Sequence, residues 1–481
     1  MPLPAATPQG LFSKVLIANR GEIALRIIRA CKELGIATVA IHSEADKESL
    51  HVLLADEAYC VGPAAAAKSY LNTANILSVA LMSGAQAIHP GYGFMAENAQ
   101  FAQMCKDHEL VFIGPSPEAI TQMGDKATAK RTMEAVGLPV IPGLDGTTAS
   151  PELIKAWAAK AGYPILIKAT AGGGGKGMRL VEREADVETL LSSARTEAQA
   201  AFGNPEVYIE KYILQPRHIE FQILADRYGN VVHLGERDCS IQRRHQKLIE
   251  EAPSPVMTPA LREEIGQRLL KAIRKIGYEG AGTVELLFDK DMNYYFMEMN
   301  TRIQVEHPVS EMISGIDLLK EQIKVAAGQP LAFTQDDITL NGHAIECRVN
   351  AEDPAKNFRP MPGTIDGYLA PGGPGVRVDS HAYPGYAFPP FYDSLVGKLI
   401  VHGANRTEAI ARMKRALDEY AITGIKTTIP FHQALLQHPV FVEGKAVYTN
   451  FLTEHPELLE SLSDEAQAAA KEAAIPITKT K

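Results

Sequence analysis

The stretch EMNTRIQVEHP, residues 298–308, carries a polar or charged side chain at every second position up to Glu306. Alternate side chains of an extended strand share one face. The stretch therefore predicts one wall of a site, formed by Glu298, Asn300, Arg302, Gln304 and Glu306. Three of these groups carry oxygens suited to Mg²⁺, the guanidinium suits a small oxyanion, and a further carboxylate remains. This combination predicts a site for a metal ion and a phosphate.

A second carboxylate, Glu285 in GTVELLFD, lies on another apolar strand just before this stretch. A short hairpin joins the two strands, so we expect Glu285 and Glu298 to lie opposite one another. Two buried like charges are costly unless a cation lies between them. A bound Mg²⁺ would remove that cost, as it does at nucleotide sites. The alternative is that each carboxylate pairs with a nearby Arg or Lys at a sheet edge.

Residues 14 to about 115 alternate short apolar strands with helical segments. The strand VLIAN is followed by a helix over 22–34, with Ile23, Ile27, Cys31 and Leu34 on one stripe, and then by the strand TVAIHS. Further strands at AQAIH and LVFIG follow helical segments. This order predicts a doubly wound parallel sheet, a Rossmann-like unit.

From about Lys126 the strands carry charged residues inside apolar runs, as in HIEFQILAD and TVELLFD. The sequences DRYGN and DKDMN predict antiparallel hairpins. A third region begins near His343, passes through the Pro- and Gly-rich residues 354–385, and ends in a helix over 407–420. The last residues are alanine-rich and polar, and we expect a frayed helix or a disordered tail there.

The loop AGGGGKG, residues 171–177, lies between the predicted strands YPILIKA and MRLVE. It does not match the phosphate-binding motif GxxxxGK[ST], because Gly177 follows Lys176 where Ser or Thr is required. Its match to GxGxxG is uninformative, since any long glycine run satisfies that pattern. We interpret the loop as a mobile lid whose N–H groups cover a triphosphate, and a plain flexible linker is the alternative.

Several basic residues are candidates for contacts with an anion. Lys168 lies inside an apolar strand and needs either an anion or a route to the sheet edge. Lys126 opens a helix, and the run QRRHQK, residues 242–247, is either an anion site or a solvated basic face. His89 ends a parallel strand, where ligands gather, yet a structural role is favoured.

Composition narrows the class of protein. A chain of 481 residues, 46% of them hydrophobic, is long enough for two or three domains. A net charge of -9 argues against nucleic-acid binding, and no apolar run is long enough to span a bilayer. The five cysteines show no CxxC spacing, and residues 1–10 do not resemble a secretory signal. We therefore expect a cytoplasmic protein that neither enters a membrane nor binds nucleic acid.

Seven separated motifs resemble, in order and spacing, those of the biotin carboxylase family of ATP-grasp enzymes. The motifs are IANRGEIALRIIRAC, HPGYGF, MGDK, IKATAGGGGKGM, ERDCSIQRRHQK, EMNTRIQVEHPV and ECRVNAEDP. The resemblance implies an α/β and α+β protein with an N-terminal Rossmann-like domain over 12–125. An ATP-grasp domain over 126–340 would follow, with its glycine-rich lid at about 140–212. A C-terminal biotin carboxylase domain over 341–455 and a tail over 456–481 would complete the chain.

The resemblance also implies a role for each matching residue. Residues implied for ATP are Lys126, Lys168, Gly174, Gly175, Glu210, Lys211, Ile213, His218, Gln242, His245, Glu285 and Glu298. Those implied for Mg²⁺ or Mn²⁺ are Glu285, Glu298 and Asn300, and those for bicarbonate are Lys247, Arg302, Gln304 and Val305. Arg348 would bind biotin, and the catalytic residues would be Arg302, Glu306, Lys247 and Arg348.

The activity that the resemblance implies is the carboxylation of biotin with ATP and bicarbonate, through carboxyphosphate. Biotin would arrive on a carrier protein, because Met413 and Lys414 do not form the AMKM signature of a biotin-accepting lysine. Carboxyltransferase subunits are then expected partners, and the family suggests a homodimer. Acetyl-CoA carboxylase of fatty acid biosynthesis is the favoured system, with pyruvate or propionyl-CoA carboxylase as alternatives.

Two other classes stay open on the sequence alone. Another ATP-grasp ligase, one that forms carbamoyl phosphate or joins an amino acid, would share the metal carboxylates and an acyl-phosphate intermediate. A regulatory protein that binds nucleotide without turnover would share the fold, although every implied catalytic position here holds a chemically competent residue. Stimulation of ATP hydrolysis by bicarbonate and by free biotin distinguishes these classes.

Overall fold

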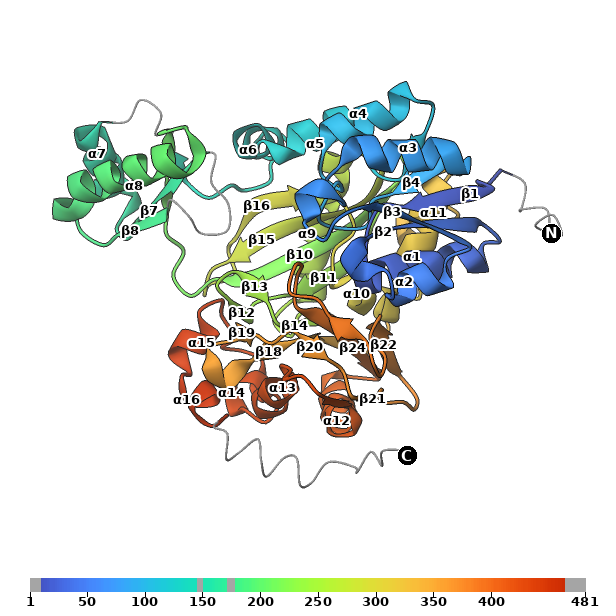
Figure 1. Ribbon diagram of the computed structural model, residues 1–481. Coiled ribbons are helices and arrows are strands. Elements are labelled where there is room, and N and C mark those ends of the chain that lie inside the picture. Colours follow the sequence, from blue (N-terminus) through green and yellow to red (C-terminus); the bar gives the residue numbers. More distant parts are fainter. Residues whose placement is uncertain (1–9, 145–149, 171–177, 463–481) are drawn as a thin grey trace.

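The computed structural model describes residues 10–144, 150–170 and 178–462. Its N-terminal part is a parallel sheet of order β3-β2-β1-β4-β5 with helices on both faces (Figure 1). The strands are β1 (Lys14–Ile17), β2 (Ala37–Ser43), β3 (Glu57–Gly62), β4 (Ala87–His89) and β5 (Val111–Phe112). The helices are α1 (Gly21–Glu33), α2 (Leu50–Leu54), α3 (Thr73–Ser83), α4 (Ala99–Asp107) and α5 (Pro117–Gly124). The predicted doubly wound sheet is confirmed.

Buried side chains of α1 and two glycines with positive φ shape the first part of this sheet. Ile23, Ile27 and Cys31 of α1 are fully buried, as the predicted stripe requires, and Gly35 ends the helix region with φ +72°. Gly91, just after β4, also has positive φ, and a Cβ there would meet the Asn19 amide at 2.9 Å. The turns that follow β1 and β4 therefore pack closely at the carboxyl edge of the sheet, where doubly wound proteins bind ligands.

A small α/β unit stands apart at the left of Figure 1. Its sheet has the order β6-β9-β7-β8, and the helices α7 and α8 pack over it around Ile167 and Ile209. The elements are β6 (Gly143–Leu144), α7 (Pro151–Ala161), β7 (Ile165–Ala169), β8 (Met178–Val181), α8 (Val187–Phe202) and β9 (Val207–Lys211). Strands β7 and β8 pair antiparallel, as YPILIKA and MRLVE predict. The glycine loop between them lies outside the described residues.

The centre of the molecule is an antiparallel sheet of order β16-β15-β10-β11-β14-β17-β24-β22. Its strands are β10 (Arg217–Ala225), β11 (Val231–Asp238), β14 (Ile249–Ala252), β15 (Gly280–Phe288), β16 (Tyr294–Asn300), β17 (His343–Asn350), β22 (Val376–Ser380) and β24 (Leu395–Gly403). The predicted hairpins at DRYGN and DKDMN join β10 to β11 and β15 to β16. The third region predicted from the sequence is not a separate sheet, because β17 continues the central sheet next to β14.

The remaining elements cover this sheet. The helices are α6 (Lys126–Glu134), α9 (Pro259–Ile276), α10 (His307–Ser314), α11 (Leu318–Ala326), α12 (Arg406–Glu419), α13 (Ile429–Leu435), α14 (Pro439–Glu443), α15 (Phe451–Glu454) and α16 (Glu457–Glu460). The short strands are β12 (Gln242–Arg243), β13 (Gln246–Lys247), β18 (Glu352–Asp353), β19 (Arg359–Pro360), β20 (Gly363–Thr364), β21 (Gly367–Leu369), β23 (Ala387–Phe388) and β25 (Ala421–Thr423). All five cysteines are free thiols. None of the helices described here combines the length and the apolar character needed to cross a bilayer.

Candidate active site

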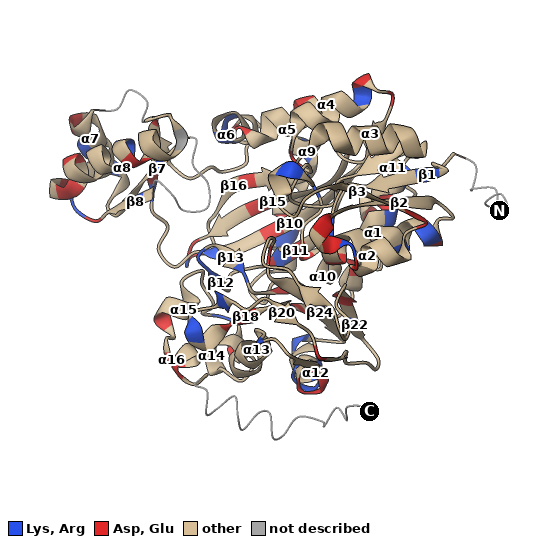
Figure 2. Ribbon diagram, viewed as in Figure 1, with Lys and Arg blue, Asp and Glu red and all other residues tan. Residues whose placement is uncertain are grey.

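Acidic and basic residues lie together on the central strands β10, β11, β13 and β15 (Figure 2). Glu285 on β15 pairs in register with Glu298 on β16, as the short hairpin predicts. Burial and the neighbouring Glu285 raise the pKa of Glu298. Lys126 Nζ lies 3.9 Å from Glu298 Oε2. Two adjacent carboxylates that repel one another suit a divalent cation, which would lower this repulsion.

The predicted extended strand over 298–306 is wrong beyond Asn300, where β16 ends. Glu306 is instead the residue that precedes α10. The side chains still converge, because the turn folds back over β15. Asn300 Nδ2 and Gln304 Nε2 donate to Glu285 Oε1 at 2.8 and 2.7 Å. Arg302 donates to Asn300 Oδ1 at 2.9 Å.

Lys247 lies at the centre of the site. Its Nζ is 2.6 Å from Glu220, 3.0 Å from Glu285 and 2.6 Å from Glu306. Burial alone would lower the pKa of Lys247, but the three carboxylates raise it well above its ordinary value. The lysine is therefore charged, and it holds three buried carboxylates together on three different elements.

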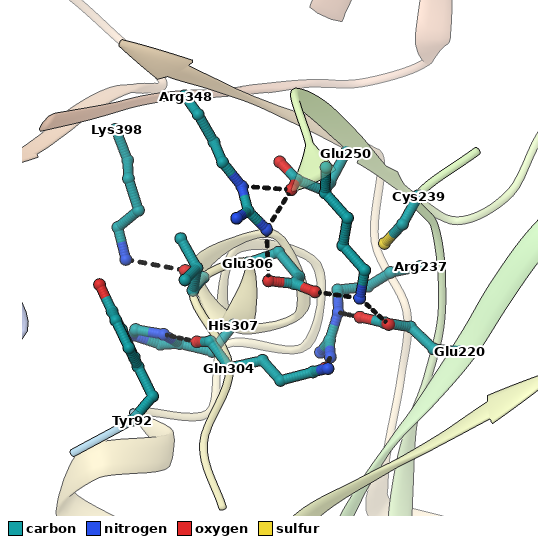
Figure 3. Close-up of polar contacts among 12 residues, drawn as sticks. Tyr92, Glu220, Arg237, Cys239, Glu250, Gln304, Glu306, His307, Arg348 and Lys398 are labelled. Carbon is teal, nitrogen blue, oxygen red and sulfur yellow. Dashed lines mark hydrogen bonds and ion pairs between the residues drawn. The ribbon is translucent and has the colours of Figure 1, made fainter. Parts of the chain in front are cut away.

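Glu306 lies between two cations, Lys247 and Arg348. Figure 3 shows its contact with Arg348. Its Oε1 accepts from Lys247 at 2.6 Å and its Oε2 accepts from Arg348 at 2.8 Å. Burial opposes ionisation, yet Lys247 and Arg348 together keep the pKa of Glu306 below its ordinary value. A carboxylate held ionised beside two cations can accept a proton from an anion bound between them.

Three other side chains of this cluster, Glu220, Arg237 and Glu250, were not among the predicted site residues, although Arg237 lies in the motif ERDCSIQRRHQK. Arg237 is fully buried and donates to Glu220 at 2.7 Å and to Gln304 at 2.6 Å, so it orients both. Glu250 accepts from Arg348 Nε at 2.6 Å, and burial raises the pKa of Glu250 to about 7. The charges inside the apolar strands HIEFQILAD and VVHLGERD could have pointed to Glu220 and Arg237, and the motif ERDCSIQRRHQK also contains Arg237.

A second group of cations lies nearer the small α/β unit. Lys168 on β7 is 2.6 Å from Glu210 on β9, so its predicted need for an anion is met by Glu210 in this structure. Lys130 on α6 also pairs with Glu210, and sequence reasoning did not single it out. Glu210 was expected to contact adenine, and here its carboxylate contacts two lysines.

The other predicted nucleotide residues are spread more widely. His218 Nε2 is 3.1 Å from Glu285, and Gln242 contacts the Nδ1 atom of the same ring at 3.0 Å. Burial would lower the pKa of His218, but Glu285 and Glu220 raise it to about 9. Lys211 donates to the Gly162 carbonyl at 2.8 Å.

Ile213 is half-buried in the segment after β9, and His245 is exposed in the turn between β12 and β13. The turn holds Arg244 and His245 at positive φ. Gly174 and Gly175 lie outside the described residues. The Val305 carbonyl accepts from the fully buried Lys398 at 2.8 Å.

Two further residues, Tyr92 and Lys398, lie outside the stretch 298–308 and contact a common partner, Glu22. Tyr92 of HPGYGF donates to Glu22, and it lies on the side of Lys398 in Figure 3. Lys398 Nζ is 3.2 Å from Glu22. His89 is fully buried and accepts from Gly91 N at 3.1 Å, and burial lowers its pKa to about 3, so the structural interpretation of His89 is confirmed.

The Rossmann-like unit, the separate α/β unit and paired carboxylates on adjacent strands define an ATP-grasp ligase. Three family models match in sequence: "Biotin carboxylase, N-terminal domain" over 11–120, "Carbamoyl-phosphate synthase L chain, ATP binding domain" over 125–334, and "Biotin carboxylase C-terminal domain" over 346–454. The biotin carboxylase of Nostoc sp. is 62% identical over 92% of this chain and 99% of its own length.

Two further relatives come from other carboxylase systems. A pyruvate carboxylase subunit of Methanothermobacter thermautotrophicus is 57% identical over 92% of this chain and 90% of its own length. The second is the biotin carboxylase domain of Hydrogenobacter thermophilus 2-oxoglutarate carboxylase, which was solved as a dimer with MgADP, ADP and bicarbonate. Its structure matches with a TM-score of 0.88 and 52% sequence identity, over 93% of this chain and 99% of that chain. The chain belongs to the biotin carboxylase family, whose members are ATP-dependent ligases.

Proposed function

We propose that this chain carboxylates biotin on a separate carrier protein, with ATP, Mg²⁺ and bicarbonate, and that it serves acetyl-CoA carboxylase in fatty acid biosynthesis. One observation carries the proposal: Glu306 lies between Lys247 and Arg348, at 2.6 and 2.8 Å. A carboxylate in this position could accept a proton beside two cations, of which Lys247 contacts Glu285 and Arg348 contacts Glu250. The arrangement suits a reaction with two stages.

In the first stage bicarbonate binds against Lys247, Arg302 and Gln304, with Val305 beside it. Glu306 accepts the bicarbonate proton, and the resulting oxyanion attacks the γ-phosphorus of ATP. The bond from the γ-phosphorus to the bridging oxygen breaks, which yields carboxyphosphate and ADP. Lys247 offsets the negative charge throughout this stage.

Residues on β15 and β16 would hold the metal ion. Glu285, Glu298 and Asn300 supply oxygen ligands, and bound Mg²⁺ would neutralise charge on the transferring phosphoryl group. Lys126 and Lys168 would contact the phosphates, with Gly174 and Gly175 from the loop. His218, Gln242 and His245 would lie on the ribose side, and Glu210, Lys211 and Ile213 on the adenine side.

In the second stage carboxyphosphate breaks down to CO₂ and phosphate. Phosphate takes the N1 proton of biotin, and Arg348 stabilises the enolate form of the ureido group, which attacks CO₂. Arg348 is pre-positioned for this role, because Glu250 and Glu306 both accept from its guanidinium. Closure of the small α/β unit would keep water from carboxyphosphate.

ADP release from ATP and Mg²⁺, with and without bicarbonate and free biotin, tests the proposal. We expect release to depend on bicarbonate and to rise with biotin. Dependence on bicarbonate without any biotin effect would favour another ligase that forms carboxyphosphate. An absence of turnover under all conditions would support a regulatory protein that binds nucleotide.

A second candidate system is pyruvate carboxylase, because one of the relatives from that system is 57% identical to this chain. Reconstitution with the biotin carrier and carboxyltransferase subunits of the same organism separates the two systems. We expect radioactive bicarbonate to label the carboxylation product of acetyl-CoA and not that of pyruvate. We also propose that the enzyme works as a homodimer in the cytoplasm, and light scattering after gel filtration measures its mass.

A further inference from the structure

A group of three metal-ligating side chains lies on the C-terminal helices, apart from the residues discussed above. His438 precedes α14, His455 follows α15, and Glu457 begins α16. His438 Nε2 and His455 Nδ1 are 3.3 and 3.2 Å from the same atom, Glu457 Oε1. One ligand atom from each residue lies within 4.8 Å of the others.

These separations fit a tetrahedral metal ion. Bonds of about 2.0–2.1 Å at tetrahedral angles place two ligand atoms about 3.3 Å apart. The two edges that meet at Glu457 Oε1, 3.3 and 3.2 Å, match this value, and the third edge, between the two imidazole nitrogens, is within 4.8 Å. We propose that His438, His455 and Glu457 bind Zn²⁺, with water in the fourth position.

The chemistry of the ligands selects this ion over Mg²⁺. Two imidazole nitrogens and one carboxylate suit Zn²⁺, whereas Mg²⁺ prefers an octahedron of oxygens. The proposed site therefore differs in kind from the carboxylate and amide oxygens of Glu285, Glu298 and Asn300. A single ion type need not fill both sites.

The two imidazoles are held in place before any ion arrives. Both rings lie against the buried Phe451, with centroid separations of 5.5 Å from His438 and 4.6 Å from His455. The side chain of Glu457 is 58% exposed, while those of His438 and His455 are 14% and 21% exposed. An ion can therefore enter from solvent on the side of Glu457.

The site would fasten a segment that supports the catalytic strand β10. Between His438 and His455, the carbonyls of Gly444 and Lys445 accept from Arg217 at the start of β10. Thr449 N donates to the Pro216 carbonyl at 2.9 Å. Zn²⁺ would join both ends of this segment and so stabilise its contacts with β10.

Calorimetric titration of the full-length, untagged, zinc-free protein with ZnCl₂ tests the site. Excess Mg²⁺ keeps the proposed site at Glu285, Glu298 and Asn300 filled. We expect one equivalent of Zn²⁺ to bind, and the melting temperature to rise. The variants His455→Gln and Glu457→Gln should lose this binding and the rise in melting temperature, while their ATP hydrolysis without zinc stays unchanged.

The control is His108→Gln, which removes an exposed histidine from the end of α4 and should bind Zn²⁺ like the unchanged protein. Circular dichroism confirms that each variant is folded. A folded unchanged protein that binds no Zn²⁺ overturns the proposal. Binding that persists in both site variants also overturns it, because the ion then lies elsewhere.

Discussion

The side chain of Lys247 pairs with three buried carboxylates at once. It is the common partner of Glu220, Glu285 and Glu306, which come from β10, β15 and the turn before α10. Removal of one partner from a buried ionic group leaves uncompensated charge, which costs more than the pair itself contributes. The position is therefore important for stability as well as for catalysis.

We predict that Lys247→Gln lowers the bicarbonate-dependent rate of ADP release at least about 100-fold, because a buried cation facing the reacting oxyanion is lost. The same change should lower the free energy of unfolding by about 3–5 kcal/mol, since three carboxylates lose their shared cation. Steady-state kinetics and urea denaturation measure the two effects. Lys271→Gln, on the exposed face of α9, is the control and should change neither. A Lys247→Gln protein of unchanged stability would contradict this account.

His432 on α13 predicts a pH dependence of stability. It is fully buried, its Nε2 donates to the Arg348 carbonyl at 2.8 Å, and burial lowers its pKa from 6.5 to about 4. The unfolded chain therefore binds a proton between pH 6.5 and 4 that the folded chain does not bind. The free energy of unfolding must fall as the pH falls through this window, by up to about 3 kcal/mol from this residue.

In His432→Gln this dependence should be absent. The free energy of unfolding of the unchanged protein should then fall more steeply than that of the variant between pH 7 and pH 4.5, whatever the cost of the substitution at pH 7. Denaturation curves at the two pH values give the difference in slope. Parallel losses in both proteins would show that His432 does not titrate as described.

At the scale of single elements, local patterns and packing carry different information. The hairpins at DRYGN and DKDMN, the helix α1 and the strand β7 follow from turn residues and apolar periodicity. The end of β16 at Asn300 does not follow from any pattern, because the alternation of polar residues continues to Glu306. A turn replaces the strand there, and Gln304 in this turn donates to Glu285. The alternation of polar residues therefore predicted which side chains converge, and it did not predict the conformation of the backbone that carries them.

Gly266 within α9 gives a prediction about an element. A Cβ at this position would overlap the imidazole of His233 on β11, which is buried against Phe221. Gly266→Ala should therefore destabilise the protein by about 1–3 kcal/mol, although alanine favours helix more than glycine does. Thermal and urea denaturation measure the change.

The matched control is Gly124→Ala in α5, where an added Cβ meets nothing within 4 Å. That change should be neutral or stabilising by up to about 1 kcal/mol. Equal effects at the two positions would mean that His233 moves aside without cost, contrary to the packing argument.

At the scale of the whole molecule, one sheet crosses the boundary that the sequence suggested near residue 341. Strand β17 pairs with β14 from Ile249 to Ala252, and α10 packs on Ala344 and Ile400 through Val309 and Ile313. Arg348 reaches Glu306 only because of this pairing. The ranges 12–125, 126–340 and 341–455 remain predicted boundaries, and the last of them starts inside a shared sheet.

We therefore predict that a fragment of residues 341–481 does not fold alone. Without β14 and α10 its β17 edge and its apolar contacts are exposed to water. Circular dichroism and urea denaturation of the fragment should show no cooperative transition. Co-expression with residues 1–340 should restore a folded complex, and cooperative unfolding of the isolated fragment would contradict the shared-sheet argument.

The sequence by itself determined the family, the doubly wound N-terminal sheet and the pairing of Glu285 with Glu298, because each depends on motifs or periodicities within a short stretch of chain. Only the tertiary structure decided that Lys247 collects three carboxylates, that Arg237 and Glu250 orient the site, and that Arg348 reaches Glu306. These contacts join strands distant in sequence, and their register depends on how whole layers pack. No local preference encodes that packing.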